Sequence, residues 1–162
     1  MVRPVVKPHD ERTPRLTGGR LAAGFFMMLA MVGAMVTFLD DAGFEHPDWP
    51  MPILAAGVIG AMAGWSQLGR NLGHDFLASG FFGMGAACVG LVFFALVYGF
   101  RSAYITHIGV QFDAAIDVIG HIVKTGVTVL QAFVASPRTV AALALGAAIS
   151  GVLAEYCNRI WK

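Results

Sequence analysis

Two long apolar stretches separated by a short polar turn constrain the fold of this chain more than any other feature. Residues 53–69 and residues 76–100 contain no Asp, Glu, Lys or Arg, and only the turn RNLGHD, residues 70–75, lies between them. About 20 apolar residues in a helix span the ~30 Å hydrocarbon core of a bilayer. A helix also satisfies its own backbone hydrogen bonds where no water is available. The pattern therefore predicts two membrane-spanning helices joined by a tight hairpin.

The rest of the chain extends this membrane architecture. Its residues are 57% hydrophobic and 13% charged, whereas soluble domains carry roughly 25% charged residues. The formal net charge of +1 gives no general attraction to nucleic acid. We predict an all-α membrane protein with four transmembrane helices and one amphipathic interfacial helix between the third and the fourth. The four spans are residues 21–39, 53–69, 76–100 and 139–156, and the surface helix covers about residues 107–135.

The first 20 residues differ from this membrane domain of residues 21–162. They contain three prolines and five basic residues, which disfavour a long helix. We predict a mobile basic tail there. The following loop, residues 40–52, is acidic and has no Lys or Arg, while Arg159 and Lys162 close the chain. Because basic residues concentrate on the cytoplasmic side, both termini are predicted to be cytoplasmic.

Residues 107–135 show a different periodicity, with apolar residues at steps of three and four. Such a pattern predicts a helix with one apolar and one polar face, lying along the outer membrane surface. The apolar face comprises Phe112, Ile116, Ile119, Val123, Val127, Leu130 and Val134, and the polar face Asp113, Asp117, His121, Lys124, Thr128 and Gln131.

Two polar groups are candidate cation sites. Asp113, Asp117 and His121 recur every four residues, and two carboxylates with an imidazole could ligate a divalent metal. Ligands spread over two helical turns converge poorly, so a solvated helix face is the favoured interpretation. Topology alone explains the second, acidic group in the first loop. That group comprises Asp40, Asp41, Glu45, His46 and Asp48.

Small residues mark the expected helix contacts. Gly60 and Gly64 lie one helical turn apart in the second span. Small residues recur every four positions in the last span, and such ridges allow close backbone approach in lipid. They are Ala142, Gly146, Ser150 and Ala154. We predict that this ridge packs against Gly60 and Gly64 of the second span.

Catalytic and cofactor chemistry finds little support in the sequence. No histidine lies in the middle of a predicted span, which argues against a haem-binding or chlorophyll-binding bundle. Glu155 near the edge of the last span is the one ionisable residue there, and we interpret it as an ion-pair partner of Arg159. Cys88 and Cys157 are interpreted as small buried hydrophobic residues. We expect no catalytic site, cofactor, metal, nucleic acid or small-molecule substrate; the expected partners are the lipid bilayer and other membrane-protein subunits.

Two motifs resemble a known family. Residues 60–73, GAMAGWSQLGRNLG, resemble the GW-xxx-GRxxG turn of the TrgA family, and residues 146–162, GAAISGVLAEYCNRIWK, resemble its C-terminal signature. Residues 45–49, EHPDW, match more loosely, so the resemblance covers roughly residues 21–162. The family comprises small bacterial inner-membrane proteins named from a tellurite-resistance locus.

The resemblance implies a non-catalytic, multi-pass inner-membrane protein linked to tellurite or envelope stress tolerance, and it implies no catalytic residue. The alternative is an accessory or assembly subunit of a large photosynthetic or respiratory membrane complex. A transporter or oxyanion-handling protein has the least support, because the predicted spans have few polar residues.

Overall fold

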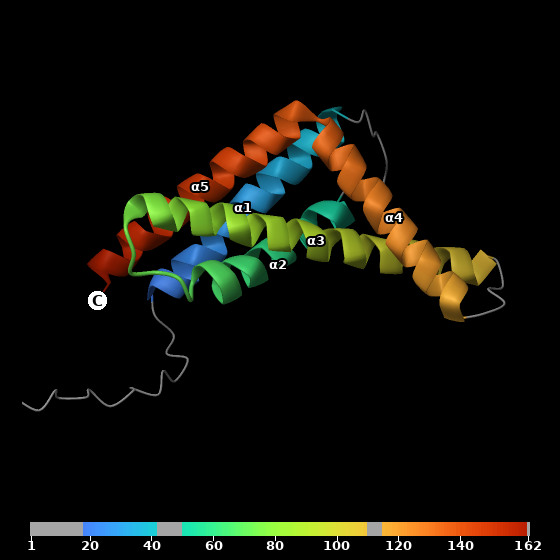
Figure 1. The fold of residues 1–162 in the computed structure, drawn as a ribbon, viewed down its shortest axis with the longest axis horizontal. Helices are drawn as coiled ribbons and strands as arrows, with labels where there is room; N and C mark the ends of the chain where they lie inside the picture. Colours follow the sequence, from blue (N-terminus) through green and yellow to red (C-terminus); the bar gives the residue numbers. More distant parts are fainter. Residues whose placement is uncertain (1–17, 42–49, 110–114, 162) are drawn as a thin grey trace, which may run out of the picture.

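The computed structural model describes residues 18–41, 50–109 and 115–161, and this part of the chain is helical apart from short connections (Figure 1). Its elements are α1 (Gly18–Asp41), α2 (Pro50–Ala63), the π-helix η1 (Gly64–Leu68), α3 (Phe76–Gly109), α4 (Ala115–Ala135) and α5 (Pro137–Ile160). The all-α class is confirmed. Five helices are long and apolar enough to cross a membrane: Gly18–Asp41, Pro50–Leu68, Phe76–Ile105, Ile116–Ala135 and Pro137–Ile160.

The boundaries of the first two helices differ from the predicted ones. Gly18, Gly19 and Arg20 form the first turn of α1 instead of the end of the tail. Helix α2 begins at Pro50 and includes Pro52, whereas both were expected in the loop of residues 40–52. The first turn of a helix tolerates proline because its N–H groups have no intrahelical partner. Residues 1–17 of the predicted tail and residues 42–49 of the acidic loop lie outside the described residues.

Four of the helices form a bundle in which α1 is central. Helix α1 packs antiparallel against both α2 and α5, and α3 packs against α5 and α2 on the other side (Figure 1). Alanine and methionine form much of the buried core. Alanine lets helix backbones approach closely in lipid, and the flexible methionine side chain fills irregular gaps. The core residues of α1 are Ala23, Met27, Ala30, Met31, Ala34, Met35 and Leu39.

The glycines of the second span contact α1. A Cβ atom on Gly60 would lie 2.8 Å from the Cβ of Met31, and one on Gly64 would overlap the carbonyl oxygen of Ala23. These two glycines therefore set how closely α2 approaches α1.

The small-residue ridge of the last helix also contacts α1. A Cβ atom on Gly146 would lie 3.1 Å from the Cβ of Ala30, and the Ser150 hydroxyl donates to the Phe26 carbonyl oxygen at 2.9 Å. The predicted contact between this ridge and the second span is wrong. Small residues indicate that a helix can approach another one closely, but they do not specify the partner, and here α1 lies between α2 and α5.

A π-helical turn follows α2 and was not predicted. The Gly69 N–H donates to the Gly64 carbonyl oxygen at 2.8 Å, a bond that spans five residues instead of four. Leu68 is fully buried at the end of this wider turn, while Trp65 remains partly exposed. The π turn thus closes the second span directly before the hairpin turn.

Helix α4 packs along the C-terminal part of α3, which extends beyond the bundle (Figure 1). A Cβ atom on Gly99 would lie 2.5 Å from the Ile122 carbonyl oxygen, so the two backbones are in close contact. Ile122 and Phe133 are buried, and Phe133 stacks on Phe38 of α1 with a ring separation of 5.3 Å. The predicted apolar stripe lies beside this buried face and is exposed over Ile116, Ile119, Val123, Val127 and Val134.

Candidate functional site

The two ends of the bundle hold most of its polar contacts between helices. At one end, Gly18 lies against the ring of Trp161, and a Cβ atom on Gly19 would lie 2.8 Å from the Cβ of Asn158. The hairpin turn of residues 69–75 lies at the same end, which we call the turn end. At the opposite end, Asp41 of α1 meets Ser136 at the junction of α4 and α5, and we call this the elbow end.

Glu155 is the centre of the turn end. Its residue surface is 1% exposed, and each carboxylate oxygen has a partner. The Gly73 N–H donates to Oε2 at 2.7 Å, and Arg159 Nε donates to Oε1 at 2.9 Å. Gly73 has a φ of +101°, a conformation that glycine adopts without strain. The carboxylate therefore fastens the hairpin turn to α5, and the predicted pairing of Glu155 with Arg159 is confirmed.

Arg159 extends this contact along the turn. Its Nη2 atom donates to the His74 carbonyl oxygen at 3.0 Å, and its guanidinium lies 4.2 Å from the centre of the Phe76 ring. The His74 ring in turn lies 5.4 Å from the Phe82 ring. The arginine thus connects α5 to the turn and to the start of α3 while 46% of its side chain remains exposed.

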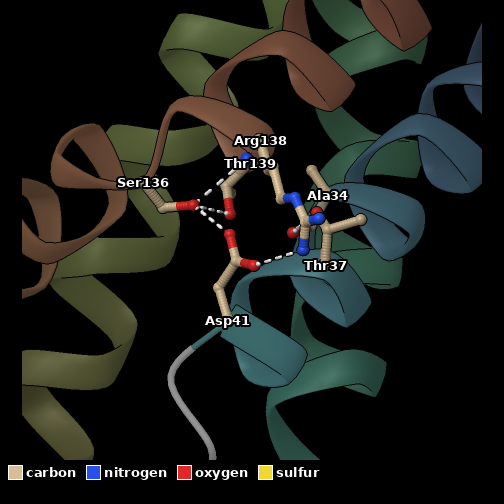
Figure 2. Close-up of polar contacts among 6 residues, drawn as sticks. All are labelled: Ala34, Thr37, Asp41, Ser136, Arg138 and Thr139. Atoms are coloured by element: carbon tan, nitrogen blue, oxygen red, sulfur yellow. Dashed lines mark hydrogen bonds and ion pairs between the residues drawn. The ribbon is translucent and has the colours of Figure 1, made fainter.

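The elbow end is organised by Asp41 and Ser136 (Figure 2). Ser136 is the N-cap of α5: its hydroxyl oxygen accepts from the Thr139 N–H at 3.3 Å, and Pro137 follows in the first turn. The same hydroxyl donates to Asp41 Oδ2 at 2.5 Å, and Arg138 lies 3.4 Å from Asp41 Oδ1. The C-terminal end of α1 is therefore tied to the start of α5.

Four polar side chains are buried among the described residues: Ser79, Thr139, Ser150 and Glu155. Thr139 and Ser150 make hydrogen bonds within the helical framework. The Ser79 hydroxyl has no hydrogen-bond partner, and it lies where α3 crosses α5 at Gly151. Ser150 and Glu155 thus connect different elements, whereas the Thr139 hydroxyl bonds to Ser136 at the start of its own helix.

The described residues of the two candidate cation sites are Asp117, His121, Asp40 and Asp41, and they form no metal-binding group. Asp117 is exposed, and His121 Nε2 lies 3.2 Å from the Ser102 hydroxyl of α3. Asp113 and the loop residues Glu45, His46 and Asp48 lie outside the described residues. Within residues 18–41, 50–109 and 115–161, no three His, Cys, Asp or Glu side chains form a group that could hold a metal ion.

The contact between Glu155 and Gly73 was missed from the sequence. The two residues are 82 positions apart, and no spacing rule connects them. The signal that could have been used is chemical: a carboxylate near the end of an apolar span needs hydrogen-bond donors, and a glycine in a tight turn has a free N–H to offer.

Comparison of the chain with protein-family models, with curated proteins and with solved structures gave no match. The features that bear on function are therefore the helices that can cross a membrane and the polar contacts at the two ends of the bundle.

Proposed function

We propose that this chain is a non-catalytic integral inner-membrane protein of the TrgA type. It acts through contacts with other membrane proteins and contributes to tellurite or envelope stress tolerance. The supporting observation is how Glu155, the buried ionisable side chain of the described bundle, is bonded. Both of its oxygens are occupied by structural partners, Gly73 and Arg159, which fits an anchor better than a proton carrier or a ligand.

The arrangement of α1 and α5 supports a four-span topology. These helices are antiparallel neighbours, so Gly18 and Trp161 lie at the same end of the bundle. A chain that enters and leaves a bundle on the same side of a membrane crosses it an even number of times. The proposed spans are α1, α2 with η1, α3 and α5, while α4 begins and ends on the side of the elbow end.

Charge supports the orientation of this bundle. Arg20, Arg70 and Arg159 lie at the turn end, whereas Asp40 and Asp41 lie at the elbow end. Since arginine and lysine concentrate on the cytoplasmic side of inner-membrane proteins, we propose that the turn end, with Gly18 and Trp161, faces the cytoplasm.

The exposed stripe of α4 supports its place at the outer membrane surface. Ile116 and Ile119 are 71% and 56% exposed, whereas Asp117 and Lys124 lie on the other exposed face. A helix with one apolar and one charged face is stable in the membrane interface, with the apolar side chains toward the acyl chains.

Cysteine labelling from outside the cell tests this placement. We expect a membrane-impermeant maleimide to modify Asp117→Cys and Lys124→Cys in intact cells, because these positions face water. Ile116→Cys and Ile119→Cys should be protected by lipid. Equal labelling of all four positions would contradict an interfacial helix.

The same experiment needs a cytoplasmic control and a cysteine-free background. Cys88→Ala with Cys157→Ala removes the native thiols. Arg70→Cys at the turn end should react only after the cells are permeabilised, and its modification from outside would reverse the proposed orientation.

A deletion strain tests the physiological part of the proposal. We expect loss of the gene to lower the tellurite concentration that the bacterium tolerates, and the wild-type gene to restore it. Unchanged tolerance to tellurite and to envelope stress would contradict this part. Co-migration of the protein with a large photosynthetic or respiratory complex after mild detergent extraction would favour the accessory-subunit function instead.

A further inference from the structure

Two arginines from different elements lie near each other at the turn end. Arg20 of α1 donates through Nε to the carbonyl oxygen of Gly69 at 3.3 Å, and a Cβ atom on Gly69 would lie 3.0 Å from the Arg20 Cγ. Gly69 directly precedes Arg70 in the hairpin turn. The contact therefore brings the Arg20 guanidinium close to the backbone next to Arg70.

These two guanidinium groups lack a carboxylate partner, unlike two other arginines of the chain. Arg159 pairs with Glu155 and Arg138 pairs with Asp41. Within the described residues, neither Arg20 nor Arg70 forms an ion pair, and Asp75 on the same turn forms none with them. A carbonyl oxygen positions Arg20 without neutralising it, so two positive charges remain available at this edge of the bundle.

The surroundings of the arginine pair resemble the boundary between lipid headgroups and acyl chains. Trp65 is 37% exposed on η1 and lies beside α1, with its Cβ 3.8 Å from the position of a Cβ on Gly24. Tryptophan is enriched at this depth of a membrane. Leu21 and Phe25 follow Arg20 on α1, and they are 52% and 54% exposed. A charged pair thus lies next to an apolar surface.

We propose that Arg20 and Arg70 bind the phosphate of an anionic phospholipid headgroup, with its acyl chains lying along Leu21 and Phe25. A guanidinium presents several N–H donors in a planar fork that matches phosphate oxygens. Basic pockets between membrane helices on the cytoplasmic side are known to select anionic lipids. A zwitterionic lipid carries an ammonium group that the second arginine repels, so the pair favours phosphatidylglycerol over phosphatidylcholine.

Native mass spectrometry of the full-length protein in detergent tests this site with added phosphatidylglycerol. We expect one retained lipid per chain and weaker retention of phosphatidylcholine. Each guanidinium near a membrane surface contributes about fivefold to the affinity for an anionic lipid. Arg20→Gln with Arg70→Gln should therefore reduce retention about 25-fold, and raising the salt concentration should weaken binding to the wild type.

Control variants separate loss of the site from loss of the fold. Gln at position 20 can still donate to Gly69, and Arg20→Lys with Arg70→Lys keeps both charges and should retain most of the binding. Arg138→Gln removes an arginine at the elbow end and should leave retention unchanged. The melting temperature in detergent identifies variants that are misfolded.

Three results would overturn the proposal. Equal retention of phosphatidylglycerol by the wild type and by a folded double glutamine variant excludes Arg20 and Arg70 as the site. Equal retention of phosphatidylcholine excludes selection by charge. Displacement of the lipid by millimolar inorganic phosphate would assign the arginines to free phosphate instead of a lipid headgroup.

Discussion

Gly83→Ala should destabilise the protein by about 2–3 kcal/mol, a cost typical of overpacking in a tight contact. A Cβ atom at Gly83 of α3 would overlap the Ala147 carbonyl oxygen of α5 and lie 3.2 Å from the Gly151 nitrogen. These neighbours are backbone atoms, so no side chain can rotate out of the way and the two helices must separate. Thermal unfolding in detergent and the free energy of unfolding in mixed micelles measure the effect.

Gly85→Ala on the same helix is the matched control. Gly85 is exposed, and a Cβ atom there would have nothing within 4 Å. Because alanine favours a helix over glycine by roughly 0.5–1 kcal/mol, this variant should be as stable as the wild type or slightly more stable. Equal melting temperatures for the two variants would contradict the contact between α3 and α5 at Gly83.

Glu155→Ala should have a comparably large effect at the turn end. The change leaves the Gly73 N–H without its acceptor and Arg159 without its carboxylate. A hydrogen bond to a charged group contributes about 1.5–3 kcal/mol, and because Gly73 is exposed, water replaces part of this contact. Arg159 is half-exposed, so water compensates part of its lost ion pair. We therefore expect the free energy of unfolding in mixed micelles to fall by about 2–3 kcal/mol.

Two further variants test the physical origin of that loss. Glu155→Gln keeps an acceptor for Gly73 but not the charge, and its stability should lie between those of the wild type and Glu155→Ala. Asp41→Ala breaks the other carboxylate contact, where Arg138 is 81% exposed, and should cost about 1 kcal/mol or less. A larger loss for Asp41→Ala than for Glu155→Ala would show that the elbow end is the principal anchor.

The sequence predicted the helices well because their signal is local. Apolar length predicted α1, α2, α3 and α5, and periodicity predicted α4. The predicted start of α3 at Phe76 agrees with the structure. The pairing of Glu155 with Arg159 followed from their spacing on one helix. The placement of α4 along the membrane surface stays a prediction.

The helix partners could not be predicted because they depend on contacts between distant residues. Gly146 and Gly60 both carry the signature of a close helix contact, yet each contacts α1 instead of the other. On α4, the apolar stripe predicted the side that faces lipid, but it did not indicate that Ile122 beside it packs on α3. In an apolar environment hydrophobicity does not distinguish a neighbouring helix from lipid, so periodicity alone does not identify the packed face.

The central place of α1 has a consequence for the order in which the protein is assembled during synthesis. Its contact with α2 can form early, but the Phe26 carbonyl must wait for Ser150, 124 residues later. At about 5–20 residues per second, a ribosome needs roughly 6–25 s to add that length of chain. During this interval the α5-facing side of α1 is covered by lipid or by an insertion factor, and the last helix to be made completes the packing of the first.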